Sequence, residues 1–223
     1  MTFTHRLLSL VALAFVASLG ASTANAQYAN DNTTGISVRP FTVAQAMAGY
    51  SLSSYKIHNV GVNVKGINVT GTAMPDGSYI AYRFINITKV DISGIHRTPG
   101  GHVDFIRLAS AGNKQKWPTT VKIQDAYLHD GDGIPLLVQD LWIDQLTLRN
   151  VRVERVTVGI QIGAAAAGKI DKVFIDGCPN QSIAILGRPG SIKTVYIKRS
   201  PGLKISDVLN QWGQARCKFV HLD

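Results

Sequence analysis

A short pattern of apolar residues recurs along this chain: two alternating apolar pairs separated by a two-residue turn. It is clearest over residues 146–153, where Arg149 and Asn150 separate the pairs. The second pair returns as Val173-x-Ile175 and as Val195-x-Ile197, at intervals of 22 residues. A fixed period in the twenties, filled by β-branched residues with strand alternation, is typical of stacked parallel coils. In such a stack the outward side chains carry the function.

The N-terminus has the features of a secretory signal peptide. His5 and Arg6 precede an apolar run over residues 7–19, and Ala24-Asn25-Ala26 supplies a small-x-small cleavage site before Gln27. A membrane anchor would need about 20 apolar residues. We therefore expect residues 1–26 to be removed, and the protein to be secreted or periplasmic with no membrane span.

The chain that remains is basic. The leader contains one Arg and no acid, so 22 Lys and Arg stand against 14 Asp and Glu, a net charge of +8. A basic exported domain suits an acidic partner such as a uronate-rich polysaccharide or an anionic cell envelope, and export argues against nucleic acid. Charge that serves solubility alone is an equally good explanation. Cys178 and Cys217 are the two cysteines, and in an oxidising compartment a disulfide between them is expected.

The repeated element divides the chain into segments. Further copies of the element are Val62-x-Val64 with Ile67-x-Val69, Ile85-x-Ile87 with Val90-x-Ile92, and Val121-x-Ile123 with Ala126-x-Leu128. A third short strand follows after a variable loop, at Val103-x-Phe105, Ile134-x-Leu136, Ile160-x-Ile162, Ile183-x-Ile185 and Leu203-x-Ile205. We predict an N-terminal lead-in and cap over 27–61, coils over 62–208, and a C-terminal cap or tail over 209–223. Helical spacing over 41–50 predicts a short helix covering the first coil, and a second covering helix is expected over 207–215.

Three short strands per turn, with one connection fixed at two residues, predict an all-β right-handed parallel β-helix of about six coils with short capping helices. This layout resembles the pectate-lyase-like superfamily over roughly residues 62–208. A β-sandwich or propeller predicts no such recurrence, and a left-handed β-helix has a shorter period. The resemblance places Asn150 in the tight turn between the second and third sheets. It also implies that sites usually lie on the first sheet and its flanking loops.

Outward residues in successive coils should form columns, because stacked strands lie about 4.8 Å apart. The column on the strand after the turn is expected to be Asn68, Asp91, Tyr127, Arg152, Phe174 and Tyr196. The next column is expected to be Thr70, Ser93, His129, Glu154, Asp176 and Lys198. Aromatic rings beside charges suit sugar binding, which predicts Tyr127, Arg152, Phe174 and Tyr196 as substrate-binding residues. Such ladders also serve cross-strand pairing alone.

The loops around the Val103 strand carry the most reactive side chains. We expect them to converge on two adjacent coils, with Asp104 pointing outward from the strand. The candidates are His96, Arg97 and His102 in the loop entering that strand, His129, Asp130 and Asp132 one coil later, and Lys116 and Trp117 in the insert that follows the strand. Of these, Arg97, Lys116 and Trp117 are further predicted substrate-binding residues.

Two chemistries fit these residues. A uronate lyase needs a base and a cation that stabilises the enolate, so Asp104, Asp130 and Asp132 could hold calcium, with His102, His129, Arg97 or Lys116 as base or charge stabiliser. A glycosidase needs a carboxylate pair, for which Asp104 with Asp130 or Asp132 is the candidate. The His-Asp-Gly-Asp-Gly run from His129 is equally well explained as a glycine-rich turn.

The sequence therefore predicts an exported protein that binds an acidic, uronate-containing polysaccharide, with its cleavage as a second hypothesis. A non-catalytic structural or attachment protein of the cell envelope or matrix is the alternative, supported by the short chain and by the absence of catalytic signatures.

Overall fold

The computed structural model describes residues 30–32, 34–58, 65–99, 103–156, 159–164, 168–178, 182–187, 192–201, 203–206 and 218–222. The predicted signal peptide, the expected helix over 207–215, His102 and Cys217 lie outside these ranges. Within them, no helix has the length and apolar content needed to cross a membrane.

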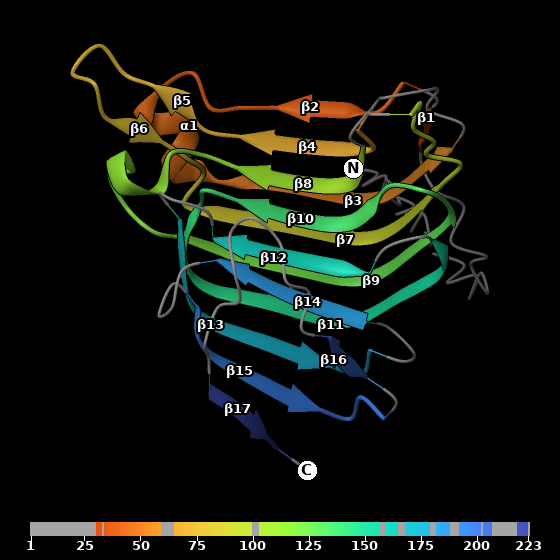
Figure 1. Cartoon of the computed structure of the whole chain (residues 1–223). Coiled ribbons are helices and arrows are strands. Elements are labelled where there is room, and N and C mark those ends of the chain that lie inside the picture. The colour runs from red at the N-terminus through yellow and green to blue at the C-terminus, as the bar shows by residue number, and fades with distance from the viewer. Residues whose placement is uncertain are drawn as a thin grey trace, which may run out of the picture.

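The described chain is almost entirely β-structure arranged in parallel sheets (Figure 1). An eight-stranded sheet, sheet A, contains β1 (Asn30–Asn32), β3 (Tyr50–His58), β7 (Phe84–Ser93), β9 (Thr119–Gly131), β11 (Trp142–Val156), β13 (Lys169–Asp176), β15 (Ile192–Lys198) and β17 (Lys218–His221). A seven-stranded sheet, sheet B, contains β2 (Ile36–Val38), β4 (Ile67–Thr70), β8 (Asp104–Ala109), β10 (Ile134–Gln139), β12 (Ile160–Ala164), β14 (Ser182–Gly187) and β16 (Lys204–Ser206). The remaining elements are α1 (Val43–Ala48), the hairpin of β5 (Thr72–Ala73) and β6 (Tyr79–Ile80), and the short 3-10 helix η1 (Gly112–Lys114).

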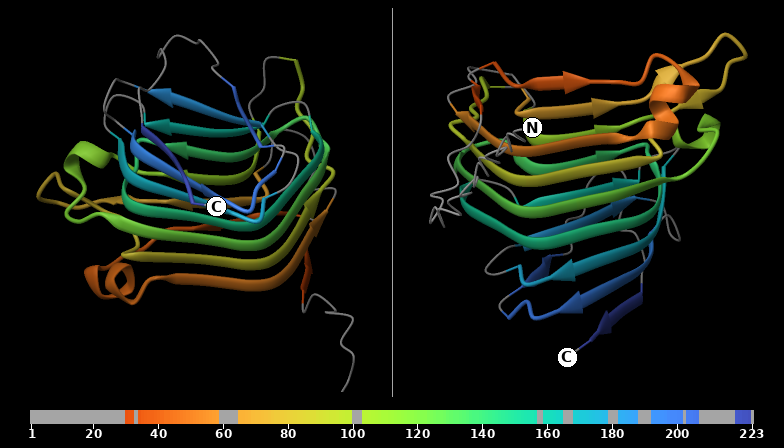
Figure 2. Two further views of the ribbon diagram at one scale, coloured as in Figure 1. Left: turned by 90° about the horizontal axis from the view of Figure 1, so that it is seen from below. Right: turned by 180° about the vertical axis from the view of Figure 1, so that it is seen from behind.

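From β7 onward the chain alternates strictly between the two sheets. Each strand of sheet A pairs in parallel with the next strand of sheet A, after an intervening strand of sheet B. Figure 2 shows the long strands of sheet A bending in the middle, so that sheet A forms two sides and sheet B a third side around the core. The predicted third strands are therefore confirmed as β8, β10, β12, β14 and β16.

The bend in sheet A is built from residues with left-handed backbone in a common register. Each comes directly after a residue that is aligned with its equivalents on the neighbouring strands, and each has a φ between 45° and 64°. They are Ser54, Lys89, Asp125, Asn150, Gly177 and Arg199. Asn and Asp tolerate this conformation better than most residues. Asn150 Nδ2 donates to Asp125 Oδ1 over 2.7 Å, which links two neighbouring bends. Asn150, predicted in a tight turn between two sheets, lies at this bend within the continuous strand β11.

Both sheets bury their inward side chains in one continuous core. Aligned residues from successive strands stack directly, as in the row Ile87, Ile123, Leu148, Ile175 and Ile197, all 5% exposed or less. Removing a side chain of this size from water contributes about 1.5–3 kcal/mol. The stack is therefore stabilised by apolar rows that run across the strands.

The predicted alignment of the last coils is wrong. Val173 and Ile175 pair with Leu146 and Leu148, which precede the turn, and not with Val151 and Val153, which follow it. The interval between equivalent positions is therefore 27 residues from Leu148 to Ile175 and 22 residues only from there to Ile197. Loop insertions change the interval while the strands stay in register, so a sequence period cannot identify equivalent strands here.

The predicted boundaries also need correction. β2 and β3 already pair with β4 and β7, so the sheets begin within the expected lead-in, and β17 adds residues 218–221 to sheet A. The pair Ile67-x-Val69 lies in sheet B and not in the strand after the turn. The predicted short helix exists as α1, but Figures 1 and 2 place it at the corner between β2 and β3 and not across the first strands.

Candidate functional site

The most densely charged part of the described surface lies at the end of sheet A that follows the bend. We call it the ionic cluster. It consists of Asp91, Tyr127, His129, Asp130, Arg152, Glu154 and Arg155, contributed by β7, β9 and β11. The register explains its composition, because Asp91 aligns with Tyr127 and Arg152, and His129 aligns with Glu154.

His129 is held between two carboxylates. Its Nε2 lies 2.9 Å from Asp91 Oδ1, and its Nδ1 lies 2.5 Å from Asp130 Oδ2. The imidazole stacks on the Tyr127 ring, with centroids 3.9 Å apart, and its side chain is 15% exposed. Both ring nitrogens of His129 are therefore engaged by carboxylate oxygens of the cluster.

Arg155 is the exposed cation that contacts both Asp130 and Glu154 of the cluster. Its Nε and Nη2 both donate to Asp130, the second over 2.8 Å, and its Nη1 donates to Glu154 Oε2 over 3.2 Å. The Arg155 guanidinium, followed by His129, holds the pKa of Asp130 well below its usual range. Asp130 is thus a carboxylate whose oxygens already accept charged hydrogen bonds.

Glu154 is engaged in the same way. The Tyr127 hydroxyl donates to its Oε2 over 2.8 Å, and Arg152 Nε donates to its Oε1 over 2.5 Å. These contacts, the Tyr127 hydrogen bond first, lower the pKa of Glu154. The Arg152 guanidinium also lies over the Tyr127 ring, 5.2 Å from its centroid. The cluster is therefore a network in which anions and cations satisfy one another.

Asp104 does not point outward as predicted. Val103 and Phe105 are buried in the core, as the sequence alignment predicted. Asp104 between them aligns with Ile134, and Ile106 with Leu136, so Asp104 is also on a row that is buried. Its side chain is 0% exposed. The first three residues of β8, from Asp104 to Ile106, are all buried, so the start of this strand is enclosed on both faces. Asp104 therefore cannot contact a polymer that lies on the surface.

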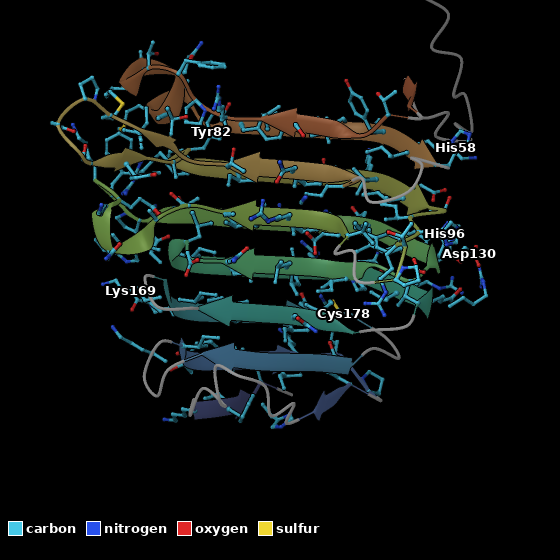
Figure 3. The ribbon with its side chains drawn as sticks, turned by 45° about the horizontal axis from the view of Figure 1, so that its top comes forward. His58, Tyr82, His96, Asp130, Lys169 and Cys178 are labelled. Atoms are coloured by element: carbon cyan, nitrogen blue, oxygen red, sulfur yellow. The ribbon has the colours of Figure 1, made fainter. Side chains whose placement is uncertain are left out.

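The other predicted site residues fall into separate places. Figure 3 shows His96 and Asp130 at one end of the strands. Asp132 Oδ1 accepts from the Arg97 backbone N–H over 2.9 Å and lies 3.6 Å from His96 Nδ1. A side chain at Gly131 would approach the Ile95 carbonyl to 2.5 Å, so close backbone packing explains that glycine.

Lys116 and Trp117 lie at the opposite end of β8, because they follow the strand whereas Arg97 precedes it. Lys116 Nζ pairs with Asp76 over 3.0 Å, and Trp117 Nε1 donates to the Ala81 carbonyl over 2.9 Å. Six extended residues span about 20 Å. The expected convergence of all these loops on one site is therefore wrong, and Trp117 is anchored to the fold.

A second candidate site lies on the part of sheet A that precedes the bend. We call it the aromatic groove, a hollow of about 290 Å³. It is lined by Lys122, Gln145, Thr147, Arg149, Phe174, Ile175, Asp176, Tyr196, Lys198 and Leu222. Phe174 and Tyr196 stack in it with ring centroids 4.6 Å apart and planes 9° from parallel. Both were predicted as substrate-binding residues, but in a column with Tyr127 and Arg152, which instead belong to the ionic cluster.

The cations of the aromatic groove differ from those of the ionic cluster. Among the described residues, Lys122, Arg149 and Lys198 have no carboxylate within ion-pair distance. The groove's own acid, Asp176, accepts from Nε and Nη2 of Arg199 over 2.7 and 2.6 Å, and this contact lowers its pKa. Asp176 also aligns with Arg149 and with Lys198, whose charges lower its pKa further after Arg199, but neither cation is within ion-pair distance of it. The groove therefore presents three cations that are not directly paired with a carboxylate of the described residues.

A larger hollow of about 660 Å³ lies near the N-terminal corner, beside Phe41 and Tyr82. Its lining contains one cation, Arg39, which lies over the Phe41 ring at 5.0 Å from the centroid, whereas the aromatic groove contains three. Figure 3 shows Tyr82 at the end of the molecule opposite His96. This hollow therefore has less of the chemistry that recognises an acid.

The structure gives little support for a metal site or a disulfide. Within the described ranges, no three His, Cys, Asp or Glu side chains are grouped as metal ligands would be. Cys178 is buried and takes the inward place of Val151 one strand further along, with the Val151 N–H 3.4 Å from its Sγ. The predicted disulfide to Cys217 is untested because Cys217 lies outside the described residues.

No protein-family model, curated protein or solved structure matches this chain. Its chemistry is therefore argued from its own residues. The residues that sequence reasoning did not select are Asp91, Glu154 and Arg155 in the ionic cluster, and Lys122, Gln145, Thr147 and Arg149 in the aromatic groove. Asp91 and Glu154 stand in the predicted columns, so a search for charges that pair across coils would have found them. The groove residues could be identified only from the observed pairing of Phe174 with Thr147.

Proposed function

We propose that this protein is an exported right-handed parallel β-helix of the pectate-lyase-like kind that binds an acidic, uronate-containing polysaccharide through the aromatic groove. The alternation of parallel strands between two sheets and the aligned left-handed bends support the fold assignment. The leader over residues 1–26 supports export.

The observation that carries the proposal is the set of unpaired cations beside stacked aromatic rings. Lys122, Arg149 and Lys198 are exposed and surround the Phe174–Tyr196 pair. Aromatic faces contact the apolar C–H faces of a sugar, while cations and amides bind its carboxylate and hydroxyl groups. Arginine adds a planar donor pair that matches a carboxylate. A polymer of uronates offers all of these partners.

We propose binding ahead of cleavage because the side chains expected to act in catalysis are already engaged. Both nitrogens of His129 and both oxygens of Asp130 contact other cluster residues, and Asp104 is buried. A general base needs a lone pair within reach of the substrate proton. A protein that holds the polymer without cutting it would serve as an attachment or structural component of the envelope or matrix.

The experiment measures binding of the purified protein to polygalacturonate and to a neutral glucan, at low and at high salt. We expect binding to the acidic polymer only, weakened by salt because exposed charges are screened. Tyr196→Ala should lower the affinity at least about tenfold, a loss of about 1.4 kcal/mol. Phe41→Ala, which removes an aromatic ring that is 64% exposed at the N-terminal corner, is the matched control and should have no effect. Equal binding of both polymers, or an unchanged affinity in Tyr196→Ala, would refute the proposal.

A further inference from the structure

The aromatic groove contains a notch above Thr147. Thr147 on β11 aligns with Lys122 on β9 and with Phe174 on β13, so a small side chain stands between two long ones in one outward row. Neighbouring strands lie about 4.8 Å apart, so the two flanking side chains start about 9.6 Å from each other. The row therefore leaves a gap one strand wide.

One wall of this notch is an aromatic face. Phe174 stacks against Tyr196 on its far side, with nearly parallel planes and a centroid distance close to the strand spacing. The planes of rings stacked in this way are roughly perpendicular to the direction that leads from one strand to the next. The opposite face of Phe174 consequently points toward the Thr147 row and is not covered by Tyr196.

The floor and rims of the notch are polar. Gln145 Nε2 donates to Thr147 Oγ1 over 3.1 Å, which orients the amide over the floor and leaves its carbonyl oxygen as an acceptor. Gln145 and Arg149 flank Thr147 on the same outward face of β11, because alternate residues of a strand point to one side. Lys122 and Arg149 are both exposed cations.

We infer that this notch binds one uronate residue of the polymer, and that it is specific for a sugar whose carboxylate is ionised. This rests on the proposed function of the groove. A pyranose between Phe174 and the Lys122 stem makes two contacts of about 4 Å each, which fits a gap of about 9.6 Å. The sugar face then lies on Phe174, its carboxylate meets Lys122 and Arg149, and its hydroxyls meet the Gln145 carbonyl.

The test compares oligogalacturonate with its methyl ester, which keeps the sugar ring and removes the charge. The wild-type protein should bind the ester at least about tenfold more weakly, because the ester cannot pair with Lys122 or Arg149. Lys122→Met should reduce this discrimination, whereas Lys114→Met, which removes an exposed cation of η1, should preserve it.

Filling the notch provides the second arm. Thr147→Trp should abolish binding, while Thr88→Trp, a matched outward threonine on β7, should bind like the wild type. Aromatic residues are favoured on strands, so both variants are expected to fold, with circular dichroism as the check. Normal binding by Thr147→Trp, together with loss of binding in Tyr196→Ala, would refute sugar binding in the notch but not polysaccharide binding in the aromatic groove. Unchanged binding in all the groove variants overturns the proposed function itself. Equal affinity of the wild type for acid and ester overturns the notch even if Thr147→Trp does not fold.

Discussion

The ionic cluster and the aromatic groove share two strands of sheet A, β9 and β11, and lie on opposite sides of the bend at Asp125 and Asn150. Both are rich in charges and aromatic rings. In the cluster, Asp130 and Glu154 bind Arg155 and His129 lies between two carboxylates. In the groove, the cations have no such partner among the described residues. The comparison shows that the two regions differ more in how their charges are paired than in how many charges they contain.

The register produces this difference. After the bend, the register lets side chains of neighbouring strands pair, as His129 does with Asp91 and Arg155 does with Asp130. Before the bend, Lys122 aligns with Thr147 and Phe174, which carry no charge. Arg149 and Lys198 align with Asp176, but its carboxylate accepts its hydrogen bonds from Arg199. Exposed ion pairs contribute little individually, but a network with stacked rings orders its members. The cluster should therefore contribute to stability and the groove to binding.

The largest expected effect separates binding from stability in the groove. Phe174→Ala removes the wall of the notch and the stacking partner of Tyr196, so the affinity for polygalacturonate should fall about 30-fold, or about 2 kcal/mol. The midpoint of urea unfolding should change little, because the ring is half-buried on the outer face. A large loss of stability would mean that the aromatic pair is structural.

The converse change is in the cluster. His129→Ala leaves Asp91 and Asp130 without their shared donor, which should lower the free energy of unfolding by about 1–3 kcal/mol while binding persists. His96→Ala is the control, since its imidazole is 61% exposed and makes one contact of 3.6 Å with Asp132. Chemical denaturation measures both. Loss of polysaccharide binding in folded His129→Ala would assign the cluster a direct role in recognition.

The bend between the two regions offers a third test. Asn150 has φ 50°, a conformation that costs a β-branched residue about 1–2 kcal/mol, so Asn150→Val should be destabilised by that amount, with a further loss from the broken contact to Asp125. Arg149→Val, one residue away on extended backbone, should keep its stability and lose affinity. Loss of affinity in Asn150→Val together with loss of stability in Arg149→Val would contradict the division of β11 into two regions.

The smallest effect appears in acid. The lowered pKa of Asp130 means that the folded protein keeps this carboxylate ionised at a pH where the unfolded chain, with an Asp pKa of about 3.9, binds a proton. Its stabilising contribution is present above about pH 4 and is lost as the pH falls toward the folded pKa. The melting temperature of Asp130→Asn should therefore fall less steeply between about pH 4 and pH 2 than that of the wild type. Phe174→Ala should retain the wild-type slope.

The sequence predicted much of the fold but less of the site. Alternating Ile and Val, the turn at Asn150 and the strands that became sheet B could all be read directly, because burial imposes a local pattern. The equivalence of Val173 with Leu146 could not be read, since a loop of changed length shifts the interval without altering the strand pattern. The burial of Asp104 could not be read either, because the start of β8 is enclosed on both faces by parts of the chain that are distant in sequence.

The sequence by itself determined that this chain stacks parallel strands around an apolar core and exposes a basic, aromatic-containing surface. That information is local: alternation, turn residues and net charge belong to short segments. Only the tertiary structure decided which of those exposed residues meet. It brought Lys122, Thr147 and Phe174 into one row and enclosed His129 between Asp91 and Asp130, because neighbour relations across strands depend on hydrogen-bond register over 25 residues or more of intervening chain.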